Sequence, residues 1–164
     1  MGGMMRFKWL VLAWLIPFMA HGAEFKYSYK SNCDCSGNLS NVQCDLEQSA
    51  SFNLFRLFKL TNESTISFDV NKRMTGNINL SYLKKDNTSV IETKMMIDNL
   101  SHTPILLEYE LKLITKEGKA DTIKGLLQVE KGKNQTFNLQ DILLSEKAAK
   151  QIYYYELKIN AKSE

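Results

Sequence analysis

Apolar and polar side chains alternate along most of the chain from residue 74 onward. The clearest run covers residues 106–116. Its apolar members are Leu107, Tyr109, Leu111 and Leu113, and the polar members between them are Glu108, Glu110 and Lys112. A period of two indicates a strand with one buried side and one exposed side, as is common in antiparallel sheets.

Clusters of Gly, Asn, Asp and Lys divide the same region into further runs. We predict strands over residues 77–83, 90–97, 122–130, 136–144 and 152–159, with a short helical or turn connector over 145–150. In the last strand, Tyr153, Tyr155, Leu157 and Ile159 are expected to share the inner face. Strands at roughly ten-residue spacing, without long helical periods, predict an all-β, immunoglobulin-like antiparallel β-sandwich over residues 74–164.

Residues 23–73 have a less regular pattern and contain all three cysteines. Residues 65–70 and 25–29 alternate and are predicted strands, whereas residues 32–41 are rich in Cys, Asp, Ser, Gly and Asn and predict a loop. Residues 46–60 fit neither the helical nor the strand period. We therefore treat 23–73 as a cysteine-containing N-terminal segment, which either extends the sandwich or forms a separate unit.

The first 22 residues have the pattern of a secretory signal peptide. Arg6 and Lys8 make a short basic start, residues 9–19 are apolar apart from Pro17, and Gly22 offers a small residue at a cleavage site before Ala23. This apolar run is well short of the ~20 residues needed to span a bilayer. The pattern predicts export, with a periplasmic location expected and an extracellular or cell-surface location as the alternative.

Removing the signal peptide changes the charge balance. Arg6 and Lys8 leave with it, so 19 of the 21 basic residues remain against 18 acidic ones, and Trp9 and Trp14 are lost as well. Because the remaining lysines are interspersed with acids, nucleic acid is not an expected partner. No other segment is both apolar and long enough to cross a membrane, so we expect no stable membrane insertion.

Cys33, Cys35 and Cys44 lie close together, and an exported chain favours a disulfide with one sulfur left over. Three interpretations are open. Cys44 bonds to Cys33 or Cys35 and fastens a loop to a strand; Cys33 and Cys35 form a reducible Cys-X-Cys bond; or the odd thiol pairs with another chain. Zinc is disfavoured because the only histidine after the signal peptide, His102, is distant in sequence.

The chain after the signal peptide offers little for bond chemistry. A single histidine, the lack of a Gly-X-Ser-X-Gly motif and the lack of a Gly-rich phosphate loop all argue against an enzyme. We expect no catalytic residues, no metal and no cofactor. Asn-X-Ser/Thr triplets at Asn38, Asn62, Asn87, Asn99 and Asn134 are interpreted as a product of composition rather than as glycan sites.

The exposed faces of the strands are the best candidates for binding a partner. If the strands at 106–116 and 152–159 are neighbours, as in many such sandwiches, two outward rows meet. These rows are Glu108, Glu110 and Lys112, and Tyr154, Glu156 and Lys158. A solvated face with modest cross-strand pairs is the simpler interpretation of these charges; a surface that discourages edge-to-edge aggregation is the functional one.

Residues 96–159 resemble the CsgC/CsgH-type curli-assembly proteins. The resemblance lies in Ile97-Asp-Asn-Leu-Ser, Pro104-Ile-Leu-Leu-Glu-Tyr-Glu-Leu-Lys-Leu, the turn at Gly118, Gly125-Leu-Leu-Gln-Val with the turn at Gly132, and Tyr154-Tyr-Glu-Leu-Lys-Ile159. The Cys33-Asp-Cys35 pair is similar to one in some members, but here it precedes the matching stretch. The resemblance implies a periplasmic, immunoglobulin-like chaperone that restrains amyloid formation by curli-type subunits without a cofactor.

Two other functional classes stay open. A secreted adhesin or fibre subunit would use the N-terminal cysteines to link chains. A thiol-disulfide oxidoreductase would use Cys33 and Cys35.

Overall fold

The computed structural model describes residues 27–33, 43–51, 62–86 and 88–164. Ten strands and one short helix follow one another in these segments. They are β1 (Tyr27–Cys33), β2 (Gln43–Ser51), β3 (Glu63–Val70), β4 (Met74–Lys85), β5 (Thr88–Asn99), β6 (Ile105–Thr115), β7 (Ala120–Val129), β8 (Gly132–Asn138), β9 (Ile142–Leu144), α2 (Glu146–Gln151) and β10 (Ile152–Ser163). No helix within these described segments is long and apolar enough to span a bilayer.

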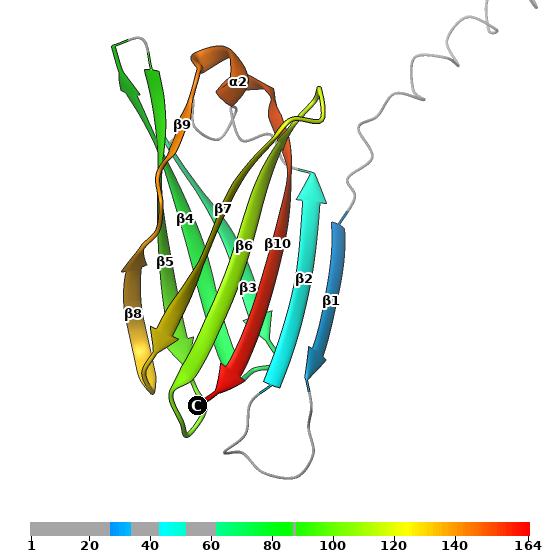
Figure 1. Ribbon diagram of the computed structural model, residues 1–164, viewed down its shortest axis with the longest axis vertical. Helices are drawn as coiled ribbons and strands as arrows, with labels where there is room; N and C mark the ends of the chain where they lie inside the picture. Colours follow the sequence, from blue (N-terminus) through cyan, green and yellow to red (C-terminus); the bar gives the residue numbers. More distant parts are fainter. Residues whose placement is uncertain (1–26, 34–42, 52–61, 87) are drawn as a thin grey trace, which may run out of the picture.

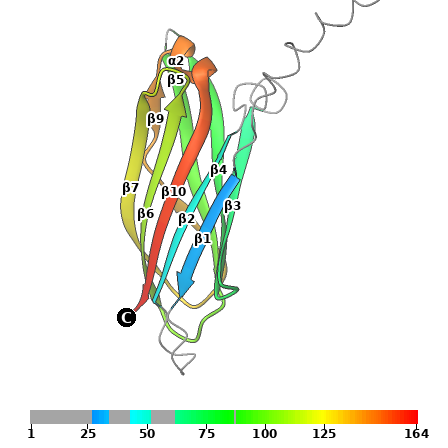
Figure 2. The ribbon, with the colours of Figure 1, turned by 90° about the vertical axis from the view of Figure 1, so that its right-hand side faces the viewer.

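The strands form two antiparallel sheets that pack face to face (Figures 1 and 2). Sheet A has the order β1-β2-β10-β6-β7. Sheet B has the order β3-β4-β5-β8, and β9 pairs with β5 beyond the end of β8. The predicted all-β antiparallel sandwich is therefore confirmed.

The first three strands are divided between the two sheets, with β1 and β2 in sheet A and β3 in sheet B. β1 pairs with β2, and β2 pairs with β10 along its whole length, from Ser51 opposite Tyr154 to Gln43 opposite Lys162. β3 pairs with β4 in sheet B. Through β2, the irregular N-terminal region thus shares backbone hydrogen bonds with the last strand of the chain.

The core lies between the sheets and follows from the alternation in the sequence. On β6, the inward residues Leu107, Leu111 and Leu113 are fully buried, and on β10 Leu157 is buried opposite Leu111 and Ile159 opposite Tyr109. Sheet B contributes Ile78, Leu80, Ile91, Met95 and Ile97 from its inner face. Burying a side chain of this size stabilises the fold by about 1.5–3 kcal/mol, so the inner faces determine which way each strand is turned.

Two polar side chains from sheet A cross to the edge of sheet B. Gln48 on β2 is only 5% exposed, and its Nε2 donates to the Ser67 carbonyl (3.0 Å) and to the Tyr155 hydroxyl (2.7 Å). Tyr29 on β1 donates its hydroxyl to the Asp69 carbonyl. Among the described strands β3 pairs with β4 alone, so these bonds satisfy carbonyls on the outer side of β3.

A glycine in sheet A makes room for an aromatic ring. Gly125 lies opposite Tyr109, and a Cβ at Gly125 would be 2.7 Å from the tyrosine oxygen. The ring of Tyr109 therefore covers the neighbouring strand at the one place without a side chain. Burial raises the pKa of the Tyr109 hydroxyl above its usual range.

Two details differ from the pattern predicted for the sequence. Tyr153 was expected on the inner face but is 41% exposed, because a bulge at the start of β10 turns Ile152 inward and shifts the register between Ile152 and Tyr154. The single strand predicted over 136–144 is divided into β8 and β9. Between them, Thr93 Oγ1 donates to the Gln140 carbonyl (2.7 Å), which holds the connection against β5.

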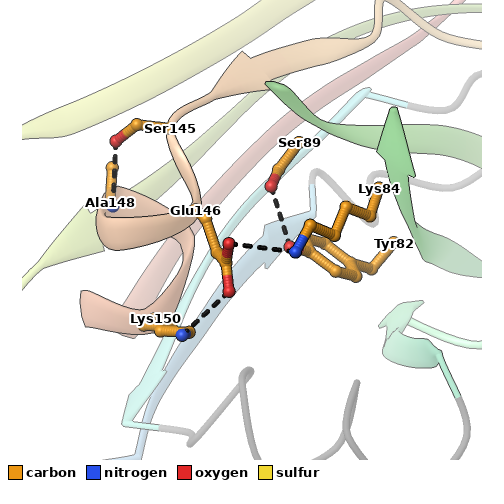
Figure 3. A network of polar contacts seen from close by, with 7 residues as sticks. All are labelled: Tyr82, Lys84, Ser89, Ser145, Glu146, Ala148 and Lys150. Atoms are coloured by element: carbon orange, nitrogen blue, oxygen red, sulfur yellow. Dashed lines mark hydrogen bonds and ion pairs between the residues drawn. The ribbon is translucent and has the colours of Figure 1, made fainter. Parts of the chain in front are cut away.

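The helix α2 connects the two sheets at one end of the sandwich and is fastened to β4 (Figures 1 and 3). Ser145 caps its first turn by accepting a hydrogen bond from the Ala148 amide (3.1 Å). Glu146 pairs with Lys150 one turn later (2.9 Å) and with Lys84 of β4 (3.3 Å). Lys150 and then Lys84 lower the pKa of this carboxyl. The predicted short helical connector over 145–150 is confirmed.

Candidate functional site

The outer face of sheet A brings together the partner-binding residues predicted for the sequence. β6 and β10 are neighbours, as expected, with Lys112 opposite Glu156 and Glu110 opposite Lys158. Directly opposed residues on one face have Cβ atoms about 4.5–5.5 Å apart. Each of these two cross-strand positions therefore combines one positive and one negative side chain.

The pairing registers extend this arrangement across the whole sheet. Lys30 on β1 is opposite Glu47, Glu47 is opposite Lys158, Lys158 is opposite Glu110, and Glu110 is opposite Lys124 on β7. We call these five residues the central charge row. Their signs alternate from one edge of the sheet to the other, beginning and ending with lysine.

Rows on either side differ in composition. Toward α2, the next row contains Ser28, Ser49, Glu156, Lys112 and Thr122. On the other side it contains Asn32, Asp45, Asn160, Glu108 and Leu126, in which Asn160 Nδ2 donates to Asp45 (2.6 Å). At the β7 edge of this last row, Leu126 is 60% exposed.

The electrostatics centre on Glu110. The Lys112 ammonium lies 3.0 Å from the Glu110 carboxylate, with the two side chains 34% and 33% exposed. The hydrogen bond from Lys112 lowers the pKa of Glu110, and attraction from Lys158 and Lys124 across the strands adds to this. The same bond raises the pKa of Lys112, with a further contribution from Glu156. Three lysines of this face therefore act on the Glu110 carboxylate, although water screens pairs this exposed.

The face is hollowed over its central strands. A groove of about 800 Å³ runs over β2, β10, β6 and β7, and Glu108, Glu110 and Lys158 line it together with Lys124 and Leu126. A smaller hollow of about 260 Å³ over β1, β2 and β10 is lined by Lys30, Glu47 and Glu156, among others. Both are open depressions in a twisted sheet rather than enclosed cavities.

Of the six predicted partner-binding residues, four line these hollows. Glu108, Glu110 and Lys158 line the larger one and Glu156 the smaller. Lys112 and Tyr154 lie on the same face, where the Tyr154 ring is 6.3 Å from that of Tyr153.

Sequence reasoning missed three members of the central charge row: Lys30, Glu47 and Lys124. Lys124 was visible on the predicted strand 122–130, but its pairing with Glu110 was not. The alternation over residues 43–51 was the signal for Glu47, and it was hidden because Gln48 occupies an inward position.

The disulfide joins Cys33 and Cys44, which lie directly opposite each other on β1 and β2. This confirms the predicted bond from Cys44 to Cys33, but the bond joins two paired strands, because Cys33 ends β1 and does not lie in the predicted loop. Cys35 lies outside the described residues. The bond stabilises the β1–β2 pair, which carries Lys30 and Glu47 at one edge of the face.

The outer face of sheet B is chemically different. Its two central rows are Thr65, Asn79, Lys94 and Asn138, and Ser67, Asn77, Met96 and Thr136. Amide and hydroxyl side chains predominate, and Lys94 is the single charge in these two rows. This contrast makes sheet B an internal control for the charged face.

Within the described part of the chain, no group of three or more His, Cys, Asp and Glu side chains is placed to hold a metal ion. No protein-family model matches the sequence, and no curated protein sequence matches it.

Proposed function

We propose that the protein is an exported, non-enzymatic binding protein that restrains the aggregation of amyloid-forming subunits of the curli type, and that the outer face of sheet A is its binding surface. The observation that carries this proposal is the central charge row, which alternates in sign over all five strands beside an open groove. The periplasmic location and the identity of the client follow from the predicted signal peptide and the family resemblance.

The strength of the pairs in this row suits transient binding. Opposed charges on an exposed sheet face contribute about 0.2–1 kcal/mol each, because water screens them and long side chains lose entropy when they pair. A client segment with charged side chains exchanges these pairs for intermolecular ones at little cost. Binding of this kind is reversible and weakens as salt increases.

The same charges oppose growth of a fibre on the bound client. Amyloid sheets associate through dry, interdigitated faces. Burying the central charge row in such an interface would remove several charges from water, and desolvation of each ion costs several kcal/mol. A client bound to this face therefore contacts a charged sheet, against which a further amyloid sheet does not pack as a dry layer.

The direct test follows fibre formation of a curli-type subunit by thioflavin T fluorescence with substoichiometric mature protein, residues 23–164. We expect a longer lag time with the wild type. Glu110→Gln combined with Lys158→Gln removes one negative and one positive charge from the row at constant net charge. We expect this variant to lose most of the delay.

The matched control carries Glu92→Gln and Lys94→Gln on β5 of sheet B, which also preserves net charge. We expect it to delay fibre formation as the wild type does. An unchanged lag time with wild-type protein contradicts the proposed function, and equal loss of activity in both variants contradicts the assignment to sheet A.

A further inference from the structure

The edge of sheet A at β7 has the features of a docking site for one additional strand. Among the described strands, β7 pairs with β6 alone, in a continuous register from Ile105 opposite Val129 to Ile114 opposite Ala120. The opposite edge of the sandwich is different, since Tyr29 and Gln48 satisfy carbonyls of β3 there.

The alternation of hydrogen bonds between β6 and β7 shows which backbone N–H and C=O groups of β7 point to the lateral edge of the sheet. At the β6–β7 turn, the Thr115 amide donates to the Lys119 carbonyl (2.8 Å), so this pair is hydrogen-bonded. Hydrogen-bonded and non-hydrogen-bonded pairs alternate in an antiparallel ladder. The backbone N–H and C=O of Thr122, Lys124 and Leu126 therefore point to the free edge.

These same residues end the rows of the outer face. Lys124 ends the central charge row with a positive charge, and Leu126, two residues on, presents an apolar side chain that is 60% exposed. A strand added antiparallel to β7 would continue the alternation with an acidic residue opposite Lys124. It would cover Leu126 with an apolar residue two positions earlier in its own sequence.

We propose that β7 captures extended segments of client polypeptide as a sixth strand of sheet A, and that it selects an apolar residue followed two positions later by an acidic one. This inference deepens the proposed function by naming the class of segment recognised. A second copy of the chain fits less well, because a β7–β7 pair centred on Lys124 would place that lysine against itself, and like charges directly opposite are destabilising.

Fluorescence anisotropy with two labelled peptides tests this proposal. The first has the sequence Thr-Val-Leu-Val-Glu-Val-Thr, and the second has lysine in place of glutamate. We expect wild-type protein to bind the glutamate peptide about five-fold more tightly, as one cross-strand charge pair of about 1 kcal/mol allows. Lys124→Glu should reverse this preference.

Leu126→Pro removes one free-edge N–H without removing a bond to β6, because that amide points away from β6. We expect this variant to keep its fold by circular dichroism and to lose binding of both peptides. Lys94→Glu, on the outer face of sheet B, should leave the peptide preference unchanged.

Equal affinity for the two peptides, undetectable binding of either, or full binding by Leu126→Pro would each overturn the proposal. So would a wild-type dimer in sedimentation that Leu126→Pro dissociates, since the occupant would then be a second copy. If all variants still delay fibre formation, the strand-docking site is wrong and the proposed function stands. If the peptides bind as expected but wild type does not delay fibres, the client class is wrong instead.

Discussion

Replacing Gln48 with leucine tests whether the polar link between the sheets stabilises the sandwich. Gln48 lies in the inner face of β2, where its amide donates to the Ser67 carbonyl of sheet B and to the Tyr155 hydroxyl of sheet A. Leucine has nearly the same size, so Gln48→Leu removes these two bonds with little change in packed volume.

The expected loss follows from the two bonds. A buried hydrogen bond contributes about 1 kcal/mol net, and a buried acceptor that loses its partner costs about 1–3 kcal/mol. The increased burial of apolar atoms in leucine offsets part of this. We therefore expect the free energy of unfolding to fall by about 2 kcal/mol, which lowers the melting temperature by about 4–8 °C in a domain of this size.

Urea denaturation followed by far-UV circular dichroism measures this change. Tyr155→Phe is the companion variant, because it removes the hydroxyl while the bond from Gln48 to the Ser67 carbonyl remains. We expect it to cost about 1 kcal/mol and expect the double variant to lose less than the sum of the two. A free energy of unfolding of Gln48→Leu within about 0.5 kcal/mol of the wild-type value would refute the role of these two hydrogen bonds. Additive losses in the double variant would refute the coupling between Gln48 and Tyr155.

Three further perturbations test separate parts of the structure. The β1–β2 disulfide joins two cysteines eleven residues apart in sequence, and we expect its reduction to lower the free energy of unfolding by about 3 kcal/mol. Urea titrations with and without dithiothreitol measure this difference. Asn99 is 1% exposed, and its side-chain amide donates hydrogen bonds to the Thr103 and Val129 carbonyls. We expect Asn99→Ala to lower the free energy of unfolding by about 3 kcal/mol in the same assay. The lowered pKa of Glu110 means that its contribution to stability is present above the ordinary glutamate range, about pH 4.3, and is lost as the pH falls through the lowered value. A carboxyl NMR titration should show this midpoint rising in Lys112→Met, and an unmoved midpoint would mean that Lys112 is not its cause.

The parts of the fold that sequence reasoning recovered share one property: their inward positions are apolar. β6 is the clearest case, since Leu107, Leu111 and Leu113 mark its buried side without ambiguity. The neighbouring position of β6 and β10, and hence the meeting of their charged rows, followed from this pattern and from the sandwich architecture.

β2 resisted the same reasoning because two of its inward residues are not ordinary core residues. Cys44 is bonded to Cys33, and Gln48 bonds partners that lie far away in sequence. The Gln48 amide is buried because partners from other strands satisfy it, and a sequence does not display such partners. Glu47 on β2, and with it the opposed Lys30 on β1, were missed for this reason.

Tyr153 shows a second limit. A bulge shifts the alternation by one residue, and the sequence Ile152-Tyr-Tyr-Tyr155 is apolar or aromatic at every position, so no polar residue reveals the shift.

Chemical-shift mapping tests the binding surface most directly. Isotope-labelled mature protein is titrated with an unfolded curli-type subunit, and amide shifts are followed residue by residue. We expect changes confined to the outward residues of sheet A, with Glu110, Lys158 and Lys124 among the largest, and expect them to diminish at high salt. Changes centred on the outer face of sheet B, or no changes at saturating subunit, would contradict the assignment of client binding to sheet A.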